Sequence, residues 1–216
     1  MIDISNQIDA IHREVGSRSA ESGEVVSVLL RRGYDAPVDD VWDAVTDPDR
    51  IKRWFMPISG DLREGGNFQL EGNAGGRILR CEPPRLLRAT FGGETSVVEL
   101  RLIPDGDGAT TFELEHTVPI EMAGSGAGAL YVGPGWDGAL MGLGLFLAGT
   151  VADDPVAAAS SPEAQEFSRH SVQAWTAAIE ASGTAAPDEI AAAVEAALAQ
   201  FAPGIGDTSD RTGQAG

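Results

Sequence analysis

His116 is the residue of this sequence whose type and position best suit chemistry. The stretch TTFELEHTVP alternates apolar and polar residues, so Phe112, Leu114 and His116 share the covered face of a predicted strand. An inward histidine near a strand end can bind a ligand oxygen or act as an acid or base. A core histidine that bonds a backbone carbonyl is the structural alternative, and it is favoured over a catalytic role.

Asn73 and Arg80 are the other polar side chains that could orient a ligand, and in an enzyme they could polarise a carbonyl group. Asn73 lies in EGNAGG, between two predicted strands. Asparagine tolerates the left-handed geometry of turns, so a turn role is favoured over a side chain directed into a cavity mouth. Trp54 and Trp136 are predicted core aromatics, and each could also stack on a flat ligand.

Other catalytic and metal-binding arrangements find no support in the sequence. Glu113 and Glu115 share the strand face opposite Phe112 and Leu114, so they are expected in solvent rather than as a glycosidase pair. The three histidines lack metal-ligand spacing, no GxSxG motif occurs, and no lysine follows the glycine pairs as a phosphate loop requires. We therefore expect no metal and no cofactor. The single Cys81 excludes an intramolecular disulfide and is expected to be a buried, inert thiol.

Composition narrows the partners of this chain of 216 residues. With 33 acidic and 15 basic residues, the formal net charge is −18, which repels phosphate backbones and anionic lipid headgroups. Nucleic-acid binding and membrane docking are therefore not expected. The longest apolar stretch, residues 138–151, is shorter than the roughly 20 residues that span a membrane. The first residues show no signal-peptide pattern, and a cytoplasmic location is predicted.

The elements that must position these side chains form an α+β pattern. Ile4, Ile8, Ile11 and Val15 recur at helical spacing, which predicts one amphipathic helix and a linker within residues 1–23. A strand begins near Glu24, and two short helices follow before Phe55. Further strands, separated by turn residues, are predicted at 67–71, 77–81, 86–91, 96–103 and 110–118. Connections this short require antiparallel neighbours.

A long helix is predicted at 136–148, after the last strand. Gly138, Gly142 and Gly144 weaken such a helix, so close approach to a sheet or a ligand is expected to require them. The fold predicted for residues 24–150 is a curled antiparallel sheet that grips this helix. Two more helices are expected at 162–181 and 188–201, within a C-terminal extension that spans 151–202. Residues 203–216 are predicted to be a disordered tail.

Four stretches of this sequence resemble one known superfamily. They are DAPVDDVWDAVTDPDRIKRWF at 35–55, EGNAGGRILRCEPPRLLRATF at 71–91, GDGATTFELEHTVP at 106–119 and GPGWDGALMGLGLFLAG at 133–149. Together they are similar to the START-like (SRPBCC, helix-grip) superfamily, in the branch of the activator of heat-shock-protein-90 ATPase homologue-like domains. The resemblance covers roughly residues 24–150 and is specific for the fold. It does not identify an activity, because domains of this superfamily have transport, cyclisation, hydrolysis and interaction roles.

The resemblance implies a cavity between the curled sheet and the late helix, and the apolar pattern of the residues supports it. A ligand pocket is mostly apolar, with a few polar groups that fix orientation. His116, Asn73 and Arg80 are the polar candidates. The apolar residues expected to line the cavity are Trp54, Phe55, Met56, Phe68, Leu70, Phe91, Phe112, Leu114, Trp136, Leu140 and Leu143.

Three functions are consistent with this sequence. The first is a carrier or sensor that binds a small hydrophobic or aromatic molecule without chemistry. The second is an enzyme of cyclase, dehydratase or hydrolase type, in which His116 would be the acid or base. The third is a protein-interaction module, either a chaperone cofactor or a homodimer formed through the apolar stripes of the terminal helices. The absence of a recognisable catalytic set favours the first.

Overall fold

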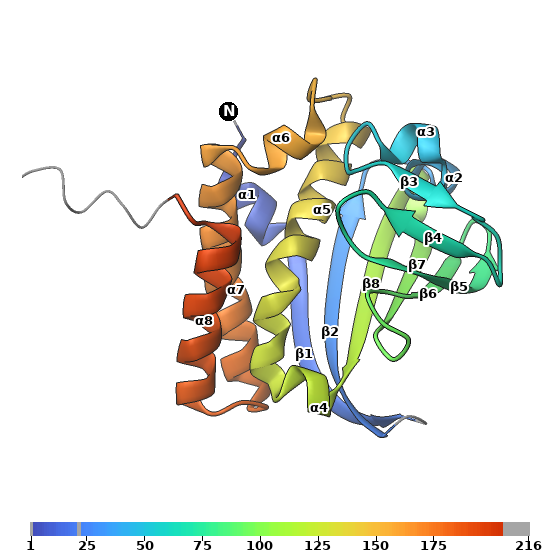
Figure 1. Ribbon diagram of the computed structural model, residues 1–216. Helices are drawn as coiled ribbons and strands as arrows, with labels where there is room; N and C mark the ends of the chain where they lie inside the picture. Colours follow the sequence, from blue (N-terminus) through green and yellow to red (C-terminus); the bar gives the residue numbers. More distant parts are fainter. Residues whose placement is uncertain (1, 21–22, 205–216) are drawn as a thin grey trace, which may run out of the picture.

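The computed structural model of this protein describes residues 2–20 and 23–204. Its centre is an eight-stranded antiparallel sheet in the order β1-β2-β8-β7-β6-β5-β4-β3 (Figure 1). The pairing of β2 with β8 brings the second strand of the chain beside the last one. The strands are β1 (Ile11–Ala20), β2 (Gly23–Tyr34), β3 (Ile58–Gly60), β4 (Asn67–Leu70), β5 (Gly75–Glu82), β6 (Leu86–Thr90), β7 (Val97–Asp105) and β8 (Ala109–Pro119).

Alternation along the strands gives the sheet one covered face and one charged face. On β8, Phe112, Leu114 and His116 are buried, whereas Glu113 and Glu115 lie on the opposite face. On β2, Leu30 is buried on the covered face, opposite Leu114 of β8. The two-residue side-chain period of a strand therefore sets which residues can reach the interior.

The long helix α5 (Gly133–Leu147) packs on the covered face of the sheet, and the predicted α+β helix-grip fold is confirmed. Close approach explains several of its glycines: a Cβ atom on Gly133 would lie 2.5 Å from the Trp175 ring, and one on Gly142 would lie 3.2 Å from the carbonyl oxygen of Trp54. A Cβ atom on Gly144 would lie 2.8 Å from Nη2 of Arg32 on β2. Gly138 differs, because a Cβ atom there would meet no heavy atom within 4 Å.

The remaining helices cap the sheet and cover α5. They are α1 (Ile4–Asp9), α2 (Val38–Thr46), α3 (Pro48–Ile51), α4 (Ile120–Ala123), α6 (Pro155–Ala159), α7 (Pro162–Ser182) and α8 (Pro187–Phe201), with 3-10 turns η1 (Gly106–Gly108) and η2 (Gly126–Tyr131). Figure 1 shows α7 and α8 on the side of α5 that lies away from β3–β5. No helix among the described residues is both long enough and apolar enough to cross a membrane.

The N-terminal prediction was wrong. Helix α1 ends at Asp9, and the expected rest of the helix and its linker form strand β1 instead. Ile11 and Val15 also fit a strand, since they lie on the same face as Arg13 and all three turn inward. The hairpin with β2, with Ala20 opposite Gly23, satisfies the backbone of this stretch along ten residue pairs. Pairing with β2 has therefore outweighed the helical spacing, which rested on four apolar residues.

The C-terminal helices form as expected from their sequence. Ser161 caps α7 by accepting the N–H of Ala164 at 3.2 Å, which is typical of an N-cap serine. Phe167, Trp175 and Ile179 of α7 are buried within this single chain. Homodimerisation through these helices stays a prediction. The tail predicted at 203–216 lies almost wholly outside the described residues, which end at Gly204.

Candidate functional site

A pocket lies between the covered face of the sheet and α5. We call it the inner pocket; its volume is about 200 Å³. Ten of the thirteen predicted ligand residues line it: Trp54, Phe55, Phe68, Leu70, Phe91, Phe112, Leu114, Trp136, Leu140 and Leu143. The other lining residues are Val45, Thr46, Ile51, Ile58, Leu62, Ile78, Cys81, Leu87, Ala89, Val98, Leu100 and Ala139.

Two polar side chains line this pocket, and neither is charged. The Thr46 hydroxyl already donates to the carbonyl oxygen of Trp42 at 2.7 Å. The Cys81 thiol is the other polar group, and partial burial raises its pKa, with the nearby Glu64 carboxylate adding to the effect. A wall of this composition favours an apolar ligand, whose binding energy comes from burial of apolar surface rather than from ion pairs.

Three predicted residues lie elsewhere. Met56 lines a different pocket, on the far side of α5. Asn73 sits in the turn between β4 and β5, where its side-chain oxygen accepts the N–H of Ala74, as the turn interpretation expected. His116 is buried but is not among the residues that line the inner pocket. Arg80, the further polar candidate, is exposed and paired with Glu82.

Both ring nitrogens of His116 are engaged inside the protein. Its Nδ1 accepts the indole N–H of Trp136 at 3.1 Å, and its Nε2 lies 2.8 Å from the Ser96 hydroxyl. Because Nδ1 must be unprotonated to accept, the neutral ring carries its proton on Nε2 and donates to Ser96. Phe91 packs edge-on against the same imidazole, with ring centroids 5.9 Å apart. His116 therefore orients Trp136, which in turn forms part of the pocket wall.

We expect His116 to make the fold sensitive to acid. Burial lowers its pKa from the usual 6.5 to about 4, so between these values the unfolded chain binds a proton that the folded chain does not. Stability is then lost as pH falls, by about 2 kcal/mol between pH 7 and pH 5. Urea unfolding of wild type and His116→Gln at both pH values measures this contribution. A glutamine variant that loses as much stability as wild type over this interval would contradict it.

A second buried polar cluster was missed by the sequence analysis. Asp137 on α5 is completely buried, and its Oδ2 accepts from Arg13 Nε at 2.9 Å, Trp175 Nε1 at 3.1 Å and the Ser171 hydroxyl. Burial raises the pKa of Asp137 to about 6, although Arg13 opposes the shift. The signal in the sequence was one acidic residue within an otherwise apolar helix, GPGWDGALMGLGLFL.

This cluster joins segments that are distant in sequence. Arg13 comes from β1, Asp137 from α5, and Ser171 and Trp175 from α7. The terminal segments are thus bonded to the central helix through one carboxylate oxygen. The cluster does not line the inner pocket, so we assign it to the fold and not to binding.

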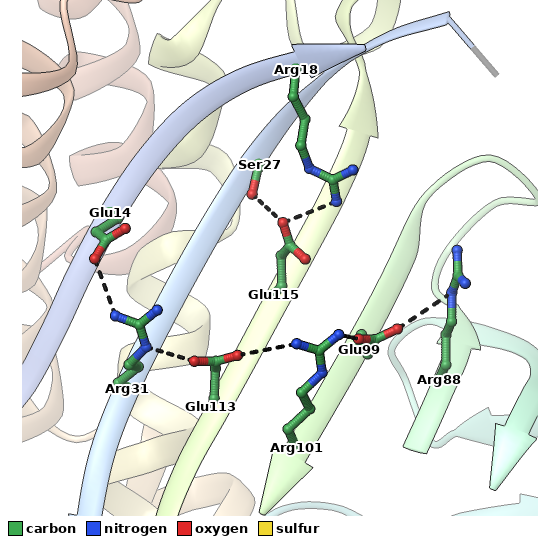
Figure 2. A network of polar contacts seen from close by, with 9 residues as sticks. All are labelled: Glu14, Arg18, Ser27, Arg31, Arg88, Glu99, Arg101, Glu113 and Glu115. Atoms are coloured by element: carbon green, nitrogen blue, oxygen red, sulfur yellow. Dashed lines mark hydrogen bonds and ion pairs between the residues drawn. The ribbon is translucent and has the colours of Figure 1, made fainter. Parts of the chain in front are cut away.

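The outer face of the sheet carries a ladder of paired charges (Figure 2). Arg31 donates to Glu113 at 2.6 Å and to Glu14 at 3.2 Å. Ser27 and Arg18 both donate to Glu115, at 2.6 Å and 3.0 Å. Arg101 links Glu113 to Glu99, and Glu99 also lies near Arg88. Glu113 and Glu115 lie opposite the covered face, as predicted, and each is held by arginine rather than free for proton transfer.

The described side chains do not form a metal site. Within residues 2–20 and 23–204, no three His, Cys, Asp or Glu side chains gather in a metal-binding group.

The part of the chain that forms the inner pocket matches a known protein family. Residues 35–147, more than half of the chain, match the family described as activator of Hsp90 ATPase homolog 1-like protein. The chain belongs to this family. The matched range contains all the inner-pocket residues, but it excludes β1, α7 and α8. No curated protein matches the chain.

Solved structures extend the similarity beyond the family range. The crystal structure of CalU16 from Micromonospora echinospora is 47% identical, covers 79% of this chain and 98% of its own, and gives a TM-score of 0.65. The solution NMR structure of CalU16 gives 45% identity and a TM-score of 0.67, covering 80% and 96%. A conserved protein of unknown function, EF2215 from Enterococcus faecalis, is 13% identical, covers 81% and 95%, and has a TM-score of 0.58, which shows the fold alone.

Proposed function

We propose that this protein binds a small hydrophobic or aromatic molecule in the inner pocket and carries or senses it without changing it chemically. The observation that carries the proposal is a pocket of about 200 Å³ between the sheet and α5, whose described lining residues are twenty apolar ones and the polar Thr46 and Cys81. Transfer of an apolar molecule from water into such a site contributes about 25 cal/mol per Å² of buried apolar surface.

The chemistry of the wall supports binding over catalysis. General acid–base catalysis needs a titratable group within hydrogen-bond reach of the reacting atom. The titratable group among the lining residues is Cys81, whose pKa is raised, so little of it is the reactive thiolate at neutral pH. His116 does not line the pocket, and both of its ring nitrogens are hydrogen-bonded, to Trp136 and to Ser96.

Cys81 offers a direct test, because it is the one cysteine of the chain and it lines the pocket. We expect a saturating apolar ligand, with naphthalene as the probe, to slow labelling of Cys81 by a thiol reagent at least about tenfold, in proportion to pocket occupancy. The rate is measured with and without naphthalene, and Leu79→Cys in a Cys81→Ala background provides an exposed control thiol. Equal slowing at both positions, or none at Cys81, would contradict the proposal.

A further inference from the structure

A second pocket lies on the other side of α5 from the inner pocket. We call it the outer pocket; its volume is about 320 Å³. Its walls come from α5 and from the segments that follow it: α6, the start of α7 and the end of α8. Figure 1 shows these helices gathered against α5. After α5, its lining residues lie between Pro155 and Ser168 and between Gln200 and Pro203.

The inner and outer pockets share a wall. Trp54, Phe55 and Ala139 line both of them. Trp54 is fixed, because its indole N–H donates to the carbonyl oxygen of Ala44 at 2.9 Å. Phe55 stacks on Trp54 with ring centroids 5.4 Å apart, and its side chain lines both pockets. The two pockets are therefore neighbours, separated by two aromatic side chains and one helix residue.

The two pockets differ in chemistry. The outer pocket adds four uncharged polar side chains to an apolar base: Ser160, Gln165, Ser168 and Gln200. Gln165 is held in place, since it accepts the N–H of Gly204 at 2.7 Å and donates to the carbonyl oxygen of Ser160 at 3.2 Å. No Asp, Glu, Lys or Arg is among the described residues that line either pocket.

Size also points to joint use of the two pockets. A site for a typical metabolite-sized molecule measures roughly 300–1,000 Å³. The inner pocket alone, at about 200 Å³, falls below that range. The outer pocket alone, at about 320 Å³, reaches the lower end of this range, and the two pockets together lie further inside it.

We infer that the ligand is an elongated, uncharged amphiphile whose apolar end fills the inner pocket and whose oxygen-bearing end passes Phe55 into the outer pocket. The inference rests on the proposed function and adds the ligand class to it. The apolar wall selects the inner end, and the hydroxyl and carboxamide groups of Ser168 and Gln200 select neutral hydrogen-bonding atoms at the other end. An anionic end would meet no basic side chain among the lining residues, in a chain whose net charge is −18.

Gly138 provides a variant that closes only the outer pocket. It lines that pocket and not the inner one, and a Cβ atom there would meet nothing within 4 Å. Gly138→Leu should fill the space, and Gly138→Ala is its matched control because a single methyl group leaves most of the pocket open. Leucine and alanine both favour helix more than glycine does, so neither change is expected to unfold α5.

The experiment uses three fluorescent probes on the full chain: naphthalene, 2-(6-hydroxyhexyloxy)naphthalene and the corresponding carboxylate, 6-(2-naphthyloxy)hexanoate. In wild type and Gly138→Ala, we expect the hydroxyl probe to bind at least about tenfold more tightly than naphthalene, and the carboxylate probe to show no such gain. In Gly138→Leu the gain should vanish, while the naphthalene affinity stays within about twofold.

Each outcome bears on one of the two proposals. Equal affinity of naphthalene and the hydroxyl probe for wild type, or an undiminished gain in Gly138→Leu, would overturn the two-pocket inference and leave the proposed function standing. Tighter binding of the carboxylate than of the hydroxyl probe would overturn the assignment of an uncharged ligand. Failure of all three probes to bind wild type would overturn both proposals.

Discussion

Asp137→Ala is expected to lower the free energy of unfolding by about 4 kcal/mol, because it removes one partner of a buried ion pair and leaves the other charge without compensation. The Arg13 side chain is only 7% exposed, and Asp137 is not exposed at all. The same substitution also deprives Ser171 and Trp175 of their acceptor. Chemical denaturation monitored by far-UV circular dichroism measures the loss.

An exposed ion pair supplies the control for this prediction. Asp49, whose side chain is 86% exposed, pairs with Lys52 at 2.7 Å, and Asp49→Ala should lower stability far less than Asp137→Ala does, because solvent screens the exposed pair. A double replacement, Arg13→Leu with Asp137→Leu, should recover part of the loss because it leaves no unpaired charge. A cost for Asp137→Ala as small as that of Asp49→Ala would show that the cluster does not hold β1 and α7 to α5.

Ala89→Phe is expected to weaken naphthalene binding at least about 100-fold, with a change in stability of less than about 1.5 kcal/mol. Ala89 lies on β6, is buried and lines the inner pocket. A phenyl ring added there competes for the same space of about 200 Å³. In a tightly filled core such an enlargement costs roughly 1–3 kcal/mol, whereas an empty pocket accepts it with little strain.

The matched control is Leu79→Phe, on the neighbouring strand β5. Leu79 is 40% exposed and does not line the inner pocket, so this variant should bind naphthalene as wild type does. Fluorescence titration measures both affinities, and thermal unfolding measures both stabilities. Wild-type affinity in Ala89→Phe would place the bound naphthalene outside the inner pocket.

The alternation of apolar and polar residues along the strands accounts for most of what could be predicted about the site. In TTFELEHTVP it separated Phe112 and Leu114, which line the inner pocket, from Glu113 and Glu115, which form the outer charge ladder. The same pattern placed His116 inside, but it could not show that Trp136 would occupy the space between His116 and the pocket. Such a contact between a strand and a helix depends on how the two elements pack, which the local pattern of apolar and polar residues does not show.

The features that escaped prediction all depend on contacts between separate elements. Strand β1 contains GSRSA, whose small and polar residues give little strand signal, and it forms because β2 pairs with it. The buried Arg13 donates a hydrogen bond from Nε to Asp137, 124 residues away, which neutralises its charge. Met56 follows Trp54 and Phe55 directly, yet it lines the outer pocket and not the inner one, and the walls of the outer pocket come from four separate segments of the chain.

The most direct test of ligand binding in the inner pocket is a crystal structure of the protein with 2-bromonaphthalene, in which anomalous scattering locates the bromine atom. We expect the ligand between the sheet and α5, in contact with Leu114 of β8 and Leu140 of α5. Anomalous signal confined to the surface, together with an inner pocket closed by the side chains of Trp54 and Trp136, would contradict the account.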